Sequence, residues 1–531
     1  MRQWKVVALV LTFGLFASSF ASAQSENDQV RRELDQVKQQ LRKVLDQNAQ
    51  ILRENAELRG RVDEVQTNDT LEQRINALAD NLDYAAGTTV NSVANPITIS
   101  GEFRARSGYT VDRDFGAFNG NAEDDEGSYT DARFNVAFEF DFDKDVTTHF
   151  ELMANALYGN GNADPNAGDL DEINLYQGWI LVRNIFGRKE LSAKTGRQEI
   201  VLGNEYQFGN NDFFSGETFD GSHWMWESDN FTLHFIFAKL NVQNPFVNPA
   251  DHPFPNAGSG DGFDDDELYS LYFTLTSIKN LTVDLYWIYF NGHNGGSFGT
   301  LANALGSSST GDALKFAGGP DFYYHTFGIR FDGVFDVAAG LDYNVEFAYQ
   351  TGNLSGSSVD VEGFSVEAEL GITFNSNNNF RLYARFLFAE GADSNNTGYI
   401  PLFPERHAQA TNLGGNDDRR ARYGVLDIIP MDNVLTVQVG LTFDPAADWT
   451  LGLTGLWAQH DEDVVTPSGS SDDIGFEIDL FGEYRYSNQT TFSAGIAAFF
   501  PDDAAPLKGG GFAGNDDDVT VLFYLQTRVV F

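Results

Sequence analysis

The chain ends in Val519-Thr-Val-Leu-Phe-Tyr-Leu-Gln-Thr-Arg-Val-Val-Phe531, a stretch in which apolar and polar side chains alternate. Because successive residues of a strand point to opposite faces, this stretch forms two faces. One face is apolar and carries Val519, Val521, Phe523, Leu525, Val529 and Phe531. The other face carries Tyr524, Gln526 and Arg528. Strands of membrane β-barrels are apolar outside and polar inside, so the tail predicts the closing strand of such a barrel.

The N-terminus has the features of a secretory signal peptide. Arg2 and Lys5 precede an apolar run over residues 6–16, and small residues follow as far as Ala23. The run is too short to span a bilayer as a helix, so we expect residues 1–23 to direct secretion and then to be removed. The terminal Phe531 resembles the C-terminal assembly signature of bacterial outer-membrane proteins. Both ends of the chain therefore predict the bacterial outer membrane.

Composition limits the class of protein. After the signal peptide there is no run of ~18 consecutive apolar residues, so a membrane location requires strands rather than helices. The 46 Phe, 20 Tyr and 52 Gly suit lipid-facing positions, interfacial aromatic residues and turns. The formal net charge of -43 argues against nucleic acid as a partner. The absence of cysteine excludes disulfides and cysteine-based metal or nucleophile chemistry.

Residues 24–83 have the apolar spacing of a helix. From Leu34 to Val65 the apolar positions recur at alternating steps of three and four, which is the seam of a heptad repeat. Asn48 and Asn55 fall at a positions of this repeat, where a buried amide specifies register and strand number. We expect an oligomeric coiled coil in the periplasm. The alternative is a single amphipathic helix with two tolerated polar sites.

Residues 84–94 are expected to form a linker, and the pattern from 95 to 531 changes to a period of two. One segment places Phe134, Val136, Phe138 and Phe140 on one face and Arg133, Asn135 and Glu139 on the other. The same pattern recurs about eighteen times, each time over roughly the 9 to 11 residues that a tilted strand needs to cross the hydrocarbon. The sequence thus predicts an all-β protein, a transmembrane antiparallel barrel of about eighteen strands.

The connections between these strands alternate between long and short. Outer-membrane barrels have long external loops and tight periplasmic turns, so an even strand number places both ends of the barrel in the periplasm. Strands are expected over 448–458 and 474–486, with the acidic residues 459–473 as a connection between them.

A more specific resemblance lies near the middle of the barrel region. The residues that carry it are a strand end, Gly196-Arg197-Gln198, the glycine Gly203, and a strand start, Phe219-Asp220-Gly221. This arrangement resembles the alginate export family of outer-membrane barrels, which are eighteen-stranded single-chain channels. Tyr206 and Ser222-His223 stand where members of that family often carry arginine. The resemblance therefore implies a channel, while specificity for a polyanion does not follow from it.

Alternation also predicts which charged side chains point into the barrel. The candidates for lining the pore are Arg104, Arg106, Arg133, Arg330, Arg381, Arg385, Arg485, Arg528, Glu139, Glu346, Glu367, Glu369, Glu477 and Asp479. A conduit for a polyuronate would need rings of guanidinium groups, because charged rings set the sign of what passes. Here arginine is abundant but counterbalanced by carboxylates. The alternative is that these groups form a structural network across the lumen.

Acidic clusters in the loops could hold Ca²⁺, which prefers oxygen ligands. The clusters are Asp124-Asp125-Glu126, Asp261 to Glu267, Asp461-Glu462-Asp463 and Asp516-Asp517-Asp518. None has the spacing of a calcium-binding loop, so solvated loop charge is the favoured interpretation and no cofactor is expected. The histidines are scattered and no serine lies in a nucleophile-elbow pattern, so we expect no catalytic residues and no enzyme activity.

These patterns predict an outer-membrane channel for small polar solutes, with saccharides or uronate-containing polysaccharide as candidate solutes. One alternative is a trimeric porin of the phosphate-selective type. Another is a structural tether between the outer membrane and the cell wall. The expected partners are outer-membrane lipid, the solute, further copies of the chain through the coil, and the cell wall.

Overall fold

The structure is a computed structural model of the whole chain, and it describes the residues that form the barrel and part of its connections. These are residues 97–111, 127–158, 173–210, 216–241, 266–292, 322–335, 340–354, 360–374, 378–393, 395–405, 423–506, 512–514 and 518–531. The expected signal peptide, coiled-coil segment and linker lie outside the described residues.

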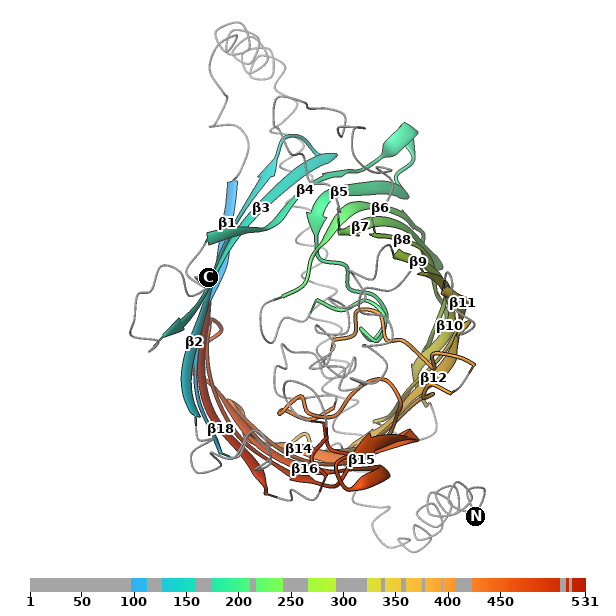
Figure 1. The fold of residues 1–531 in the computed structure, drawn as a ribbon. Coiled ribbons are helices and arrows are strands. Elements are labelled where there is room, and N and C mark those ends of the chain that lie inside the picture. Colours follow the sequence, from blue (N-terminus) through green and yellow to red (C-terminus); the bar gives the residue numbers. More distant parts are fainter. Residues whose placement is uncertain are drawn as a thin grey trace, which may run out of the picture. The chain divides into compact units, whose positions relative to one another are not determined.

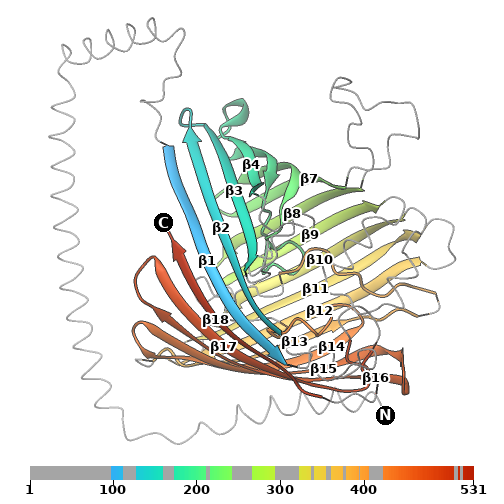
Figure 2. The same ribbon diagram turned by 60° about the vertical axis from the view of Figure 1, so that its left-hand side comes forward.

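The described residues form a closed antiparallel barrel of eighteen strands, because β1 pairs with both β2 and β18 (Figures 1 and 2). The strands are β1 (Ile97–Val111), β2 (Gly127–Asp141), β3 (Val146–Tyr158), β4 (Ile173–Val182), β5 (Leu191–Gln198), β6 (Phe219–Glu227), β7 (Phe231–Asn241), β8 (Asp266–Ile278), β9 (Leu281–Gly292), β10 (Phe322–Val334), β11 (Leu341–Leu354), β12 (Asp360–Thr373), β13 (Arg381–Ala389), β14 (Val434–Ala446), β15 (Trp449–Thr466), β16 (Gly469–Arg485), β17 (Thr490–Pro501) and β18 (Thr520–Val530). The described residues contain a single 3-10 turn, Ile185–Gly187, which lies in the connection between β4 and β5. No helix among the described residues is both long and apolar enough to cross a membrane.

The expected strand number and strand positions are confirmed, with one difference in the hairpin of β15 and β16. Residues 459–473, expected as a connection, continue both strands up to a tight turn at Pro467 and Ser468. The Thr466 hydroxyl closes this turn by donating to the Gly469 carbonyl oxygen at 2.8 Å. The register of the two strands shifts between Gln459 and Val464, and this irregularity disrupts the two-residue period in the sequence.

The two faces of the wall also follow the prediction. On β2, Phe134 lies on the outer face and is 44 % exposed, whereas Arg133 lies on the inner face and is 4 % exposed. The same alternation holds on the closing strand β18, where Phe523 and Leu525 point outward and Tyr524 and Gln526 inward. Inner and outer positions can therefore be assigned from the alternation along each strand.

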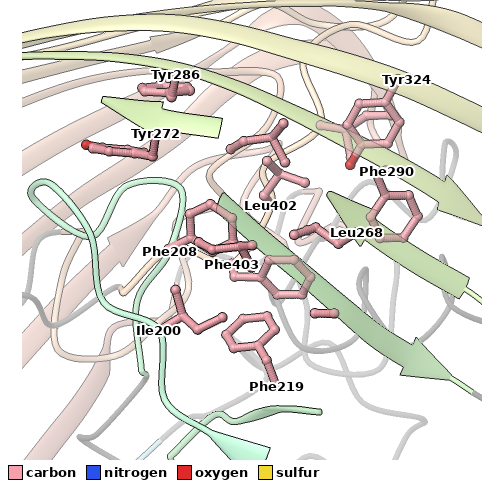
Figure 3. Close-up of a cluster of buried hydrophobic side chains, with 14 of the residues drawn as sticks. Ile200, Phe208, Phe219, Leu268, Tyr272, Tyr286, Phe290, Tyr324, Leu402 and Phe403 are labelled. Carbon is pink, nitrogen blue, oxygen red and sulfur yellow. The ribbon is translucent and has the colours of Figure 1, made fainter. Parts of the chain in front are cut away.

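The inner face is not polar throughout, contrary to the simple expectation for a channel. Between β7 and β10 it carries a large apolar cluster that includes Ile236, Leu268, Phe290 and Tyr324 (Figure 3). Where this cluster lies, the strands are apolar on both faces, because the outer face meets lipid and the inner face is covered by other parts of the chain. A strand that is buried on both faces has a continuous apolar sequence instead of an alternating one.

The seam of the barrel depends on a glycine. Gly101 on β1 and the terminal Phe531 exchange two backbone hydrogen bonds of 3.0 Å. A Cβ atom on Gly101 would lie 2.6 Å from the Phe531 ring and 2.3 Å from the Asn135 carbonyl oxygen. Both distances are far below van der Waals contact, so only glycine fits where the first and last strands meet.

Replacing Gly101 with alanine should therefore impair closure, because an added methyl group at a packed site costs about 1–3 kcal/mol. We expect less of the heat-modifiable, folded form in electrophoresis of outer-membrane fractions. Gly127→Ala is the control, because a Cβ at Gly127 meets nothing within 4 Å. Equal yields of folded barrel for the Gly101 and Gly127 variants would contradict this account of the seam.

Candidate functional site

Two long connections fold back into the barrel instead of extending away from it (Figure 1). One joins β5 to β6 and is described over 199–210 and 216–218. The other joins β13 to β14 and is described over 390–393, 395–405 and 423–433. They pair with each other, since the Gly209 amide donates to the Phe403 carbonyl at 2.8 Å and the Phe403 amide donates to the Gln207 carbonyl at 3.2 Å. These inward connections were not predicted from the sequence.

Aromatic packing holds the paired connections against the wall. The Phe219 ring at the start of β6 meets Phe403 edge-on, with centroids 4.9 Å apart, and Phe208 at 6.1 Å. All three side chains belong to the apolar cluster that covers the inner faces of β7 to β10 (Figure 3). Full burial of each such ring contributes about 1.5–3 kcal/mol, so this packing is a large part of what keeps the connections inside the barrel.

The residues that carry the family resemblance surround the base of the first connection. Arg197 and Asp220 lie opposite each other on β5 and β6 and form a bidentate ion pair, with both N to O distances 2.7 Å. The pair is on the outer face, where both side chains are exposed. On the inner side, the buried Gln198 amide donates to the carbonyls of Gly196 and Gly221, each at 3.3 Å. These contacts join the two strands at the point where the connection leaves and re-enters the wall.

Gly203 lets the same connection approach the wall closely. Its φ of +64° is in the left-handed region that favours glycine. A Cβ there would lie 2.4 Å from the Tyr272 hydroxyl and 3.3 Å from Arg330 Nε. The recognised motif therefore shapes and holds an inward connection, and its arginine does not point into the lumen.

Of the candidate pore-lining carboxylates, Glu346 and Glu367 contact the inward connections. Glu367 accepts hydrogen bonds from Asn204 at 2.6 Å and from Tyr423 at 2.7 Å, one from each connection. Glu346 accepts from Tyr286 at 2.7 Å and weakly from Gln207 at 3.5 Å. The alternation placed both residues on the inner face, but their hydrogen-bond partners could not be deduced from it.

Three candidate arginines converge on Glu102 where β18, β1 and β2 adjoin. Glu102 accepts from Arg133 at 2.9 Å and from Arg528 at 2.6 Å, and Arg104 Nε lies 3.6 Å away. Nearby, Arg106 Nε lies 3.7 Å from Asp131. Arg104, Arg106 and Arg133 are each at most 4 % exposed, so in this structure they belong to the packed inner wall.

Three further candidate arginines pair along the wall between β9 and β13. Arg330 donates to Asp284 at 2.6 Å, and Arg385 donates to Glu369 at 2.5 Å. Arg381 bridges Asp342 and Glu369, the latter at 2.9 Å. These ion pairs and those around Glu102 each link nearby residues of the same region of wall.

The remaining candidates lie apart from these groups. Glu477 is buried and accepts the Leu426 amide at 3.0 Å, and Asp479 is buried and accepts the Thr454 hydroxyl at 3.0 Å. Glu139 is partly exposed beside His149 at 3.7 Å. Arg485 ends β16 and is exposed at the end with the short turns, where it donates to the Ala447 carbonyl at 3.2 Å.

A group on the inner faces of β3 to β5 was not singled out from the sequence. His149 stacks on Trp179 with ring centroids 4.8 Å apart, and Lys194 Nζ lies 4.8 Å from the Trp179 centroid. Gln177 links Trp179 to Glu151 through hydrogen bonds of 3.2 and 2.9 Å. We call these five residues the Trp179 group. All five are partly exposed, in contrast to the buried arginines.

No group of three or more His, Asp or Glu that could hold a metal ion occurs among the described residues. Of the acidic clusters considered for Ca²⁺, Asp124-Asp125-Glu126 lies outside this part of the chain, as do most residues of Asp261 to Glu267 and of Asp516-Asp517-Asp518. The described cluster, Asp461-Glu462-Asp463, is engaged in the hairpin and its neighbours. Asp461 accepts the Gly391 amide at 3.1 Å, and Asp463 accepts the Ser470 hydroxyl at 3.1 Å.

Glu217, near the end of the first connection, has a raised pKa. Burial raises the pKa of its carboxyl from 4.5 to about 7, and the nearby carboxylate of Glu405 on the second connection adds to the rise. Because the folded pKa is raised, the neutral form stabilises the contact between the connections. This stabilisation is complete below the ordinary pKa, declines as the pH rises and is lost above pH 7.

We therefore expect the open-channel current to become noisier between pH 5 and pH 8, as ionised Glu217 is repelled by Glu405. Glu217→Gln should remove this pH dependence, because glutamine does not titrate in this range. Glu227→Gln, an exposed residue at the opposite end of β6, is the control and should behave as the wild type. A pH dependence that persists in Glu217→Gln would contradict this assignment.

Comparisons with known proteins agree with this architecture. A family model described as alginate export matches residues 95–512. No curated protein sequence matches the chain. Among solved structures, Pseudomonas aeruginosa OccK8 (OprE) is similar with a TM-score of 0.50 and 12% identity, over 82% of this chain and 98% of that chain. Pseudomonas aeruginosa OprD has a TM-score of 0.48 and 11% identity, over 82% and 95%. At these identities the structural likeness shows the fold alone.

The family match and the barrel together show an outer-membrane channel of the porin type for small solutes, rather than an enzyme. Its outer face is in contact with membrane lipid. Since the family model covers nearly the whole barrel, the chain belongs to the alginate export family.

Proposed function

We propose that the channel passes small polar solutes of the saccharide class, including uronates. The observation that carries this proposal is the Trp179 group, which combines an aromatic ring, an amide, a cation and a carboxylate on a partly exposed part of the inner wall. Saccharides present hydroxyl groups that donate and accept hydrogen bonds, together with apolar C–H faces. A surface with an aromatic residue and a few placed polar groups suits such solutes.

Two further features support a small solute. The inward connections and their apolar cluster occupy part of the cross-section of a barrel whose strand number would otherwise leave a wide aqueous channel. Lys194 can attract a carboxylate, whereas Glu151 opposes it, so neutral and uronate sugars are both compatible with the group. The description of the matched family as alginate export agrees with a uronate solute.

Interruption of the ion current by sugars in planar bilayers tests this proposal. Trp179→Ala should weaken the apparent affinity for a neutral disaccharide and for glucuronate by roughly 5- to 150-fold, equivalent to about 1–3 kcal/mol, the value of a stacked or cation–π aromatic contact with its buried area. Trp224→Ala is the matched control, because Trp224 is exposed on the outer face of β6. The saccharide assignment fails if neither sugar interrupts the current, or if both variants bind the sugars as the wild type does.

We also propose that residues 24–83 form a periplasmic coiled coil through which copies of the chain associate. The support is the heptad seam from Leu34 to Val65, because a continuous apolar stripe on a helix is stable in water only when another surface covers it. The same segment would permit contact with the cell wall. Association through the coil would produce a trimer or a dimer of channels, since asparagine at a positions is compatible with both.

The segment 24–83, expressed alone, should be helical and associate. Replacing both Asn48 and Asn55 with isoleucine should raise its melting temperature and broaden the distribution of oligomers, because the buried amides specify strand number at a cost in stability. Sedimentation equilibrium and circular dichroism check both points. A monomeric, non-helical segment at high micromolar concentration would remove the coiled-coil proposal and leave the channel function unaffected.

A further inference from the structure

Four inner-face side chains on β11 and β12 hold the two inward connections. We call Glu346, Gln350, Ser365 and Glu367 the docking strip. Glu346 and Glu367 lie directly opposite each other in the strand register, and Ser365 and Gln350 are their neighbours toward the end with the long connections. Each of the four side chains is at most 2 % exposed, so the hydrogen bonds of the strip are shielded from water.

The strip binds both backbone and side chains of the connections. The Gln350 amide accepts from the Ile400 N–H and donates to the Ile400 carbonyl, each at 2.7 Å. Ser365 shares a hydrogen bond with Tyr206 and donates to the Phe388 carbonyl at 2.9 Å. Glu367 accepts from Asn204 on one connection and from Tyr423 on the other. The strip thus satisfies polar groups that would otherwise be buried without partners.

The placement of two glutamates argues for a role beyond barrel stability. Like charges directly opposite each other in a sheet are destabilising, and burying carboxylates adds a desolvation cost. A wall built only for stability would gain nothing from this pair. Donors from Asn204, Tyr423, Tyr286 and Gln207 offset the cost, and three of these four donors come from the inward connections.

We propose that the docking strip sets the width of the channel, with Glu367 as the positioning residue that fixes both connections in one arrangement. Backbone bridges between Phe208 and Phe403 join the two connections, so we expect release of one connection to displace the other. We expect each hydrogen bond to the Glu367 carboxyl to shift the ratio of docked to undocked connections by roughly 10-fold. This inference rests on the channel function and is independent of the solute class.

The test is single-channel recording of the full-length protein in potassium chloride. Glu367→Ala should add a larger, fluctuating current level, which is absent when the connections are docked. Tyr423→Phe deletes one oxygen atom and should produce the same level less often. Tyr349→Phe is the matched control, because Tyr349 donates to Glu362 at 2.8 Å across the same strand pair but on the outer face. Heat-modifiable mobility shows that each variant is folded.

Combining variants separates the role of Glu367 from a general loosening of the wall. If Asn204 and Tyr423 act through Glu367, then Asn204→Ala and Tyr423→Phe should change the current in the wild-type background and add little in Glu367→Ala. Wild-type current levels and noise in both folded Glu367→Ala and Tyr423→Phe would overturn the proposal. Full additivity of Asn204→Ala with Glu367→Ala would overturn it as well. If Glu367→Ala does not fold, Tyr423→Phe decides the matter. A failure of the sugar experiments alone would leave this inference intact.

Discussion

Every backbone N–H and C=O group that faces lipid must be paired within the protein, and this constraint shapes the whole molecule. A sheet can meet it only by closing on itself, which here means pairing β1 with β18. Closure sets the two-residue alternation of the wall, because one face of each strand meets lipid and the other meets the lumen. It also fixes the ends of the sheet, where the terminal Phe531 pairs with Gly101.

Eighteen strands enclose an interior that wall side chains alone do not fill. The inward connections occupy part of it, and they bring a second packing requirement with them. Their apolar side chains need an apolar wall, which Ile236, Leu268 and Phe290 supply. Their backbone groups need partners away from water, and Gln350 supplies both a donor and an acceptor to Ile400. The inner wall consequently includes an apolar region, a hydrogen-bonding strip and a polar region around Trp179, beside the paired arginines and carboxylates.

The fold could be predicted from the sequence because lipid imposes a simple pattern. Alternation gave the eighteen strands and the inner position of residues such as Arg133 and Glu367, since no long-range information is needed to read it. The inward connections could not be predicted in this way, because they depend on contacts between residues far apart in sequence, such as Phe208 and Phe403. One feature of the sequence does indicate a strand whose inner face is covered. Leu285-Tyr-Trp-Ile-Tyr-Phe290 is apolar at every position, as expected for a strand covered on both faces. The expected loop at 459–473 was wrong because its carboxylates resemble solvated loop charge, although they lie in an extended hairpin.

The charged residues illustrate why a site is harder to predict than a fold. Counting inward arginines and carboxylates treats them as equivalent groups facing water, yet Arg385 and Glu369 neutralise each other and Glu367 binds the connections. The motif that identifies the family also serves the structure of the wall. Arg197 and Asp220 join β5 to β6 on the outer face, and Gly203 allows the connection to lie against Tyr272. These family residues hold an inward connection in place inside the barrel. They do not specify the solute, because one fold can host many selectivities, and the Trp179 group that we propose as the solute-binding surface lies outside the motif.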